Sequence, residues 1–253
     1  MRAEIRNLLL FSGALSPAQQ LAAYVATLSP AQWLDETTPL WQVSDGTVPA
    51  TANADPIGRW DDRSGNAKHE AQAVAAQRPT LTAGAINGLR AVTGDNTTFS
   101  QQLTVALDGT AWTGITVVIV SAPLATEGTR GIWSFADTAA SGTPLVLFQR
   151  NNADVRFYVD NGYRFTFAQA NNVPKIYIIT CDGTTWNCWF AGVKQAPYTG
   201  GLTNLASAQN VYLHTGFSAV SKSLIAETIL LNYALTDAQV NILYLLLAAK
   251  WNL

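Results

Sequence analysis

Apolar and polar residues alternate with a period of two along much of the chain, a pattern typical of strands with one buried face. The alternating segments are residues 145–150, 155–159, 163–168, 175–181, 186–190 and 210–215. Residues 116–120 form an unbroken β-branched run, TVVIV, which predicts a strand buried on both faces. Turn signals punctuate these segments at Asp108-Gly109, Asp160-Asn161-Gly162, Asp182-Gly183 and Ala191-Gly192. The pattern predicts an all-β fold, a two-sheet antiparallel sandwich.

Two segments near the ends have the pattern of short helices. The first opens at Ser16, a good N-cap residue, has Pro17 at its first helical position and runs to about Leu28. The second opens at Thr236 and runs to about Lys250. The two regions are similar at one offset (230 − 10 = 220), in the pairs Leu10/Leu230, Ala14/Ala234, Leu15/Leu235, Ala18/Ala238, Gln19/Gln239 and Tyr24/Tyr244. The likeness indicates a duplicated strand-helix unit, and chance similarity of short apolar helices is the alternative.

We therefore divide the chain into an N-terminal strand-helix extension, residues 1–33, and a sandwich domain, residues 34–253. The extension is a candidate docking element for a neighbouring subunit, and docking on its own domain is the alternative. Its candidate contact residues are the apolar side chains Leu8, Leu10, Phe11, Leu15, Leu21 and Tyr24. Residues 34–96 hold few convincing strands and are predicted to wrap the sandwich as loops.

Composition narrows the class of protein. Hydrophobic residues make up 48% of the 253 residues, enough for one large core. Charged residues are only 13%, about half the usual share, and the net charge is −2 without a basic patch, so no nucleic-acid binding is predicted. There is no apolar run of about 18 residues, so no membrane span is predicted. Arg2 and Arg6 precede a very short apolar stretch, which we interpret as folded protein rather than a secretory signal.

The two cysteines, Cys181 and Cys188, belong to one predicted hairpin. Pairing around Asp182-Gly183 does not place them opposite each other, which argues against a disulfide. We interpret both as small apolar core residues.

Three stretches carry a resemblance to a known family. The first is residues 56–66, PIGRWDDRSGN, followed by His69-Glu70-Ala71, by Arg78-Pro79-Thr80 and by residues 86–92, INGLRAV. The second is residues 180–184 with residues 189–192, WFAG. The third is residues 225–231, IAETILL, followed by Ala234-Leu235-Thr236-Asp237 and Lys250-Trp251.

In order and spacing these stretches resemble the concanavalin A-like, laminin-G-like jelly-roll family, as it occurs in phage virion proteins and bacterial surface proteins. The sequence departs from the family pattern at Arg90, where proline is usual, at residues 93–95, and at Ala191, where asparagine is usual. The resemblance covers roughly residues 34–253 and implies a jelly-roll sandwich closed by a helix. Lectins, adhesion modules, glycanases and virion proteins share this fold, so the resemblance does not decide the function.

A search for catalytic groups finds none. Glycan-cleaving sandwiches use two carboxylates on one face of a strand, and no strand here has acids at i and i+2 or i+4. His69 and His214 are the only histidines, and neither is near a nucleophile motif. We therefore predict that the protein is not an enzyme. The only cofactor considered is calcium, with Asp61, Asp62 and Asp95 as weak candidate ligands; turn capping is the alternative.

The hairpin at residues 155–168 carries the candidate recognition site. A turn centred on Asn161 places Val155, Phe157 and Val159 on the core face, opposite Phe165 and Phe167. The other face then carries Arg156 and Tyr158, with Tyr158 opposite Arg164, and Trp189 of the next hairpin is also predicted to point outward. The candidate ligand-binding residues are Arg156, Tyr158, Arg164 and Trp189. A glycan site, a protein interface and a solvated face are the alternatives for this surface.

These observations lead to two hypotheses of function. The first is a structural protein of a phage virion, such as a capsid decoration, head fibre or tail protein, located at the virion surface. Its partners would be other virion or surface proteins, in a homo-oligomer. The alternative is a carbohydrate-binding, lectin-like module of a secreted or bacterial surface protein, with glycans as its ligands.

Overall fold

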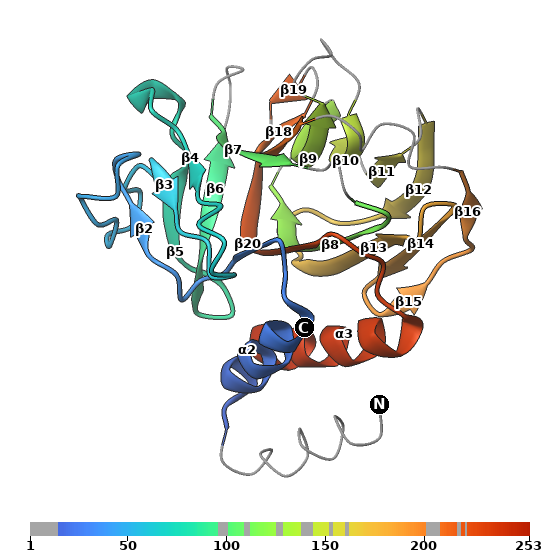
Figure 1. Ribbon diagram of the computed structural model, residues 1–253. Coiled ribbons are helices and arrows are strands. Elements are labelled where there is room, and N and C mark those ends of the chain that lie inside the picture. The colour runs from blue at the N-terminus through green and yellow to red at the C-terminus, as the bar shows by residue number, and fades with distance from the viewer. Residues whose placement is uncertain are drawn as a thin grey trace.

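A computed structural model describes residues 15–95, 101–108, 112–124, 129–137, 144–151, 154–159, 162–200, 208–216, 219–220 and 222–253. Within these residues the chain forms two large antiparallel sheets that face each other, with two helices beneath one of them (Figure 1). The predicted all-β, two-sheet antiparallel sandwich with short helices towards its ends is confirmed.

Sheet A lies next to the helices. Its strands are β1 (Gln32–Leu34), β5 (Thr80–Ile86), β6 (Leu89–Asp95), β8 (Ile115–Pro123), β13 (Lys175–Cys181), β14 (Thr185–Phe190), β15 (Val193–Lys194), β16 (Tyr198–Thr199) and β20 (Lys222–Leu231). The order across the sheet is β15-β14-β13-β8-β20-β6-β5, with β1 also paired to β20 and β16 to β14. Strands from both ends of the chain therefore meet at the centre of this sheet.

Sheet B covers the other side of the core. Its strands are β2 (Leu40–Trp41), β3 (Arg59–Trp60), β4 (Glu70–Ala71), β7 (Leu103–Asp108), β9 (Thr129–Asp137), β10 (Pro144–Asn151), β11 (Asp154–Val159), β12 (Gly162–Ala168) and β17 (Ala208–Leu213). The order is β12-β11-β10-β9-β17-β7-β4-β3-β2, which leaves β12 as an edge strand. A small hairpin, β18 (Thr215–Gly216) with β19 (Ala219–Val220), lies against β9.

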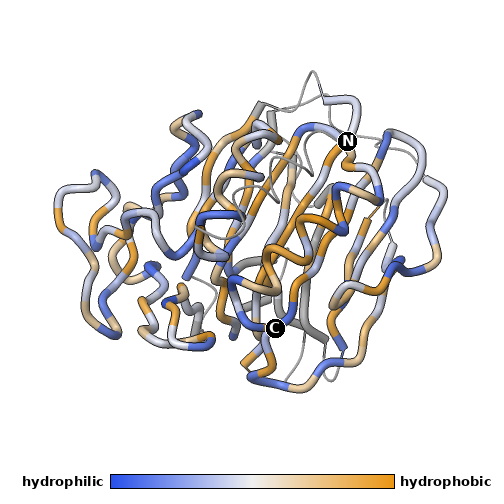
Figure 2. The backbone as a smooth tube through the Cα atoms, turned by 90° about the horizontal axis from the view of Figure 1, so that it is seen from below, coloured by the Kyte–Doolittle hydropathy of each residue, from blue (hydrophilic) through white to orange (hydrophobic). Residues whose placement is uncertain are grey.

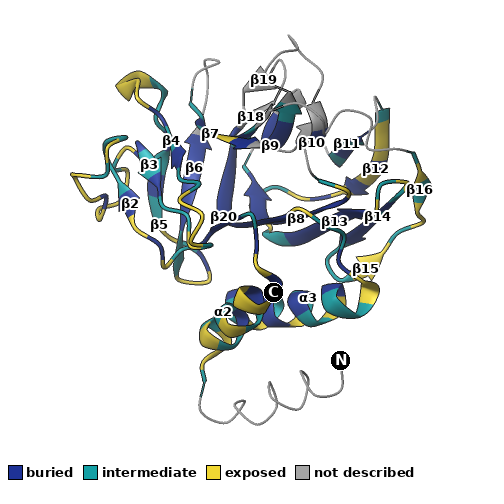
Figure 3. Ribbon diagram, in the orientation of Figure 1, coloured by how far each residue is buried: buried dark blue, intermediate teal, exposed yellow. Residues whose placement is uncertain are grey.

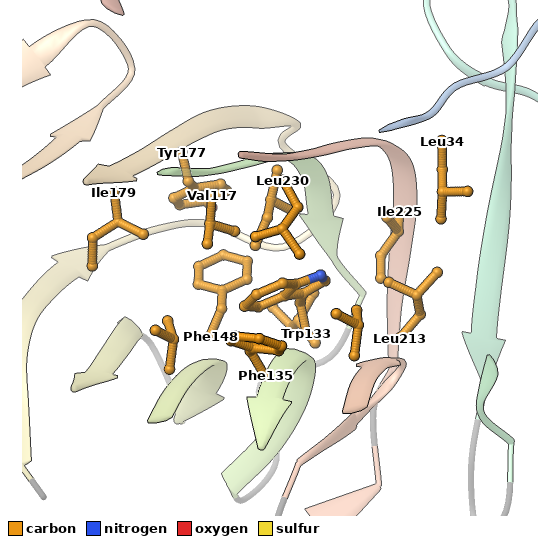
Figure 4. Close-up of a cluster of buried hydrophobic side chains, with 14 of the residues drawn as sticks. Leu34, Val117, Trp133, Phe135, Phe148, Tyr177, Ile179, Leu213, Ile225 and Leu230 are labelled. Atoms are coloured by element: carbon orange, nitrogen blue, oxygen red, sulfur yellow. The ribbon is translucent and has the colours of Figure 1, made fainter. Parts of the chain in front are cut away.

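The inner faces of the two sheets share one apolar core (Figure 4). Sheet A contributes Val117, Tyr177 and Leu230, and sheet B contributes Trp133 and Phe148, all of them buried. The rings of Phe148 and Tyr177 come within 4.4 Å across the two sheets, measured between centroids. Aromatic and branched side chains on alternating positions of facing strands account for this core.

Sheet A is also buried on its outer face. Every residue of β8 is buried, which confirms the strand predicted from residues 116–120 to be covered on both sides. Two helices, α2 (Pro17–Leu28) and α3 (Asp237–Trp251), cover this face (Figures 2 and 3). They form a second apolar cluster in which Leu21 and Leu243 pack with Val118 and Ile229 of the sheet.

Both helices begin where the sequence predicts and carry the same cap. The Ser16 and Thr236 side chains accept hydrogen bonds from the backbone N–H of Gln19 and Gln239, whose own side chains bond back to the cap residues. The helices pack on each other, and the Tyr24 hydroxyl donates to the Gln239 carbonyl oxygen. The helices of the two similar units therefore lie side by side.

Residues 34–96 are not only loops, and that prediction is wrong in part. Strands β5 and β6 form a hairpin of sheet A, joined by Asn87 and Gly88, both with positive φ (48° and 86°). Asn-Gly is the two-residue turn that favours a hairpin, so the sequence held a signal for it. The flanking strands are rich in Thr, Ala and Gly, which hid their alternation.

The cysteines lie in the inner core, as the sequence predicts. Cys181 is opposite Trp186 and Cys188 is opposite Ile179 on the β13–β14 hairpin, and both are free and buried. Burial raises the pKa of the Cys188 thiol. In the part of the chain that the structure describes, no helix is long and apolar enough to cross a membrane.

Candidate ligand-binding site

The outer faces of the two sheets differ in what covers them. The outer face of sheet A is apolar and is covered by α2 and α3 (Figure 1). The outer face of sheet B carries polar and aromatic side chains, among them Arg156 and Tyr158 on β11 and Asn210 and Tyr212 on β17, all partly exposed. Neither helix lies on this face (Figure 3). Sheet B is therefore where a ligand could meet side chains presented by a rigid sheet.

The β11–β12 hairpin shows the faces that its alternation predicts. Val155, Phe157 and Val159 point into the core, and Val155 and Phe157 lie opposite Phe167 and Phe165. This part of the prediction is confirmed.

The predicted partner of Tyr158 is wrong. The register of the hairpin shifts after Phe157, so that Tyr158 lies opposite Tyr163 and Arg164 is the extra residue on β12. Such a β-bulge adds one residue to one strand and redirects its side chain. Because of the bulge, an aromatic pair takes the place of the predicted arginine–tyrosine pair.

Three side chains form the centre of the exposed surface. The rings of Tyr158 and Tyr163 meet edge to face, with centroids 5.2 Å apart, and the Arg156 guanidinium lies 5.5 Å from the centroid of the Tyr163 ring. Tyr163 is 49% exposed. Arg156 is also held by Asp154, with Nη2 3.2 Å from Oδ2. These contacts hold an aromatic ring and a cation together on the open face.

Arg164 turns towards the edge of the sandwich. Its guanidinium lies 4.2 Å from the centroid of the Tyr198 ring on β16, which belongs to sheet A. It also lies against Gly162, where an added Cβ would come 2.8 Å from its central carbon. We call the five residues Arg156, Tyr158, Tyr163, Arg164 and Tyr198 the arginine–tyrosine strip.

The sequence missed two members of the strip. Tyr163 begins the second strand of the predicted hairpin, and only a bulge brings it opposite Tyr158. Tyr198 lies on a two-residue strand after a turn, where no periodicity signals it. For Tyr163 the sequence offered one signal, which is that this tyrosine follows the predicted turn directly and lies next to the predicted recognition face.

Trp189 does not belong to the strip. It points away from the inner core, as predicted, but that face of sheet A is covered, and its side chain is only 2% exposed. It packs in the apolar cluster beneath α3, with Lys194 Nζ 5.0 Å from its ring. Alternation along the strand predicts the side of the sheet, but not what lies on that side.

The three calcium candidates are not brought together as a site. Asp62 accepts hydrogen bonds from the N–H groups of Trp33, Ser64 and Lys68, which is turn capping. Asp61 accepts from the Trp41 indole and from Arg59. Asp95 lies in β6 of the other sheet, opposite Lys222. Among the residues that the structure describes, no group of three or more His, Cys, Asp or Glu side chains could hold a metal ion.

The candidate docking residues that the structure describes contact their own domain. Leu21 is fully buried against sheet A and α3, and Tyr24 packs against the same apolar cluster. Leu15 is partly exposed at the start of α2. Leu8, Leu10 and Phe11 lie outside the described residues. In this chain α2 therefore packs on α3 of its own domain, which agrees with the alternative for Leu21 and Tyr24, and docking on a neighbouring subunit stays a prediction.

A buried ionic cluster joins α3 to β20 and to the residues that follow β1. Lys250 Nζ lies 2.8 Å from Glu227 Oε2, 2.6 Å from Glu36 Oε2 and 3.6 Å from Asp35 Oδ2. The Glu227 carboxylate also accepts hydrogen bonds from the indoles of Trp33 and Trp251. Burial disfavours the charged ammonium, but the three carboxylates outweigh it and raise the pKa of Lys250. Burial raises the pKa of Glu227, although Lys250 opposes the shift.

His214 is a second buried titratable group. Its Nδ1 lies 3.2 Å from the Ser223 hydroxyl oxygen, and burial lowers its pKa from 6.5 to about 3, so the ring is neutral at neutral pH. Gly94 packs against the imidazole, with room for no side chain, since a Cβ there would come 2.7 Å from the ring. The sequence did not predict this Ser–His contact, because Ser223 belongs to another strand.

Solved structures share this fold. A sialidase of Trypanosoma rangeli in complex with sialic acid matches with a TM-score of 0.60 and 11% identity, over 85% of this chain and 32% of the sialidase. The receptor binding domain of botulinum neurotoxin type G matches with a TM-score of 0.51 and 11% identity, over 86% of this chain and 51% of that domain. The binding domain of botulinum neurotoxin serotype D matches with a TM-score of 0.54 and 10% identity, over 85% of this chain and 50% of that domain. No protein-family model and no curated protein sequence matches the chain.

The sialidase matches overturn one prediction. The sequence-based prediction excluded an enzyme. That exclusion is wrong, because enzymes are among the proteins that carry this fold. The chain spans about a third of the length of the sialidase chains that it matches (32%), at 12% identity, so the likeness concerns the fold of one part of those enzymes.

At 10–12% identity these structures show the fold alone, and they lend no support to the virion hypothesis. The chain shares an antiparallel β-sandwich fold with these structures.

Proposed function

We propose that this domain is a lectin-like module that binds a glycan of a receptor through the arginine–tyrosine strip. The observation that carries the proposal is the difference between the outer faces: helices cover sheet A, while sheet B presents Tyr163, 49% exposed, beside Arg156. Large exposed aromatic side chains held by charged neighbours are more common at binding surfaces than elsewhere.

The chemistry of the strip suits a sugar. A tyrosine ring offers a flat apolar face for the C–H groups of a pyranose, and its hydroxyl offers a hydrogen bond. Arginine adds N–H donors that do not depend on pH, because the guanidinium stays protonated. The Arg156–Tyr163 contact and the Tyr158–Tyr163 contact orient these groups before a ligand arrives, which lowers the entropy cost of binding.

The structural likenesses support the same function. One sialidase of this fold is in complex with sialic acid, and the neurotoxin match is a receptor binding domain. We propose that the module serves surface attachment, on a virion, on a bacterial surface or in a secreted protein, and that the chain assembles as a homo-oligomer. Light scattering of the purified protein tests the oligomer.

Tyr163→Ala tests the proposed site. We expect at least about a fivefold loss of affinity on a glycan array, because truncating an aromatic anchor commonly costs more than 1 kcal/mol. The matched control is Leu245→Ala, which truncates a 66% exposed side chain on α3, away from sheet B. Both variants should unfold at the temperature of the wild type within a few degrees. If wild-type protein binds no glycan, or if Leu245→Ala weakens binding as much as Tyr163→Ala, the proposed function is wrong.

A further inference from the structure

The arginine–tyrosine strip is more cationic than the protein around it. Strands β11 and β12 carry Arg156 and Arg164 against one acid, Asp154, and Asp160 lies between the strands in the sequence, so residues 154–168 sum to zero (2 − 2), whereas the whole chain has a net charge of −2. Both guanidinium groups are held over tyrosine rings rather than extended into solvent. Two guanidinium groups on one hairpin of an acidic protein favour an anionic partner at this face.

One N–H donor of Arg156 has no acceptor among the residues that the structure describes. Asp154 engages Nη2 at 3.2 Å, and Nε is buried without a hydrogen-bond partner among the residues that the structure describes. A guanidinium has five N–H donors in a planar fork, which matches the paired oxygens of a carboxylate or sulfate. A buried donor without a partner is costly, so a ligand oxygen that reaches Nε after the side chains around it move gains a hydrogen bond that no described protein group makes.

We propose that the glycan bound at this strip carries an anionic group, a carboxylate or a sulfate, that is held by Arg156 while the sugar ring stacks on Tyr163. This inference rests on the proposed function and adds the class of ligand. Asp154 competes with the ligand for the same guanidinium, because its carboxylate is the protein anion nearest to Nη2 in the described hairpin. Arg164, at 4.2 Å from the Tyr198 ring, extends the positive surface towards the edge of the sandwich.

The test compares neutral sugars with acidic derivatives built on them. Lactose, 3′-sialyllactose and 3′-sulfolactose, with further neutral and acidic pairs on one array, are titrated against wild type, Arg156→Gln, Arg156→Lys, Asp154→Asn and Tyr163→Ala. We expect the wild type to prefer acidic members by about 10–100-fold, the range for a charge-assisted hydrogen-bonded pair. Arg156→Gln should abolish that preference. Arg156→Lys should retain only part of it, because an ammonium lacks the fork.

Asp154→Asn and the salt dependence of binding also test whether Arg156 holds an anionic group. Asp154→Asn should strengthen binding of the acidic sugars, since it removes the competing carboxylate. Raising the salt concentration from 0.05 M to 0.5 M should weaken the acidic sugars selectively, because salt screens the attraction. Wild-type protein that binds neutral and acidic members equally, with Tyr163→Ala weakening both, would overturn the anionic ligand and leave the proposed function standing. Glycan binding that neither Tyr163→Ala nor Arg156→Gln changes would overturn both.

Discussion

Replacing Lys250 by methionine tests whether the buried ionic cluster holds α3 to the sheet. Methionine has a similar length and removes the ammonium that lies 2.8 Å from Glu227 Oε2 and 2.6 Å from Glu36 Oε2. The side chains of Lys250, Glu227 and Asp35 are 2%, 0% and 0% exposed, so water does not replace the lost cation. Removing one partner of a buried ion pair typically costs about 3–5 kcal/mol. For a domain of this size, that lowers the midpoint of thermal unfolding by about 6–20 °C.

The pH dependence separates this mechanism from a simple loss of packing. Without Lys250, burial raises the pKa of Glu227 further, since the cation that opposed the shift is gone. An acid whose pKa is higher in the folded state takes up a proton on folding, so the variant gains stability relative to the wild type as the pH falls. The deficit should therefore be larger at pH 8 than at pH 5, measured by urea unfolding at both pH values.

Lys194→Met is the matched control. Lys194 also pairs with an acid, Asp237, at 2.7 Å, but the two side chains are 38% and 61% exposed. Exposed ion pairs contribute at most about 1 kcal/mol. The reasoning is refuted if Lys250→Met unfolds within about 1 kcal/mol of the wild type, or if its deficit is the same at pH 8 and pH 5.

Two further predictions concern buried side chains. Burial lowers the pKa of His214 from 6.5 to about 3, so below pH 6.5 the unfolded chain binds a proton that the folded chain does not. Stability should fall between pH 6.5 and pH 3, by at most about 5 kcal/mol from this group, and His214→Asn should flatten that slope in urea titrations. Asn is neutral and tolerates the positive φ of 60° at this position; an unchanged slope would contradict the assignment. Trp189→Ala should lower the free energy of unfolding by about 3–5 kcal/mol, because the ring is buried beneath α3. If Trp189→Ala instead keeps the free energy of unfolding of the wild type and loses glycan binding, Trp189 belongs to the binding surface and the prediction is wrong.

Much of the fold could be predicted from local chemistry. Ser16 and Thr236 start helices because a side-chain oxygen there satisfies a free backbone N–H, and both caps form as predicted. The unbroken run at residues 116–120 predicted a strand covered on both sides, and β8 is such a strand. The β5–β6 hairpin was missed although Asn87-Gly88 signalled its turn.

The candidate site was predicted only in part. Arg156 and Tyr158 lie on an open face because their neighbours Val155 and Phe157 alternate with them and enter the core. The bulge that displaces Arg164 and brings in Tyr163 has no signature in a hairpin of ordinary length. Tyr198 joins the strip from the other sheet, 34 residues after Arg164 (198 − 164), through a contact that no local pattern encodes.

The sequence by itself determined which residues share a face and where helices begin, because those properties depend on neighbours a few positions apart. The tertiary structure decided which faces are covered. Trp189 and Tyr158 both point outward from their sheets, yet α3 covers the tryptophan, whereas neither of the two described helices lies on the outer face of sheet B, where β11 carries the tyrosine. The ionic cluster likewise forms only when Asp35, Glu227 and Lys250 are brought together from distant parts of the chain. Coverage and charge pairing arise from packing between distant segments, and alternation along one strand carries no information about them.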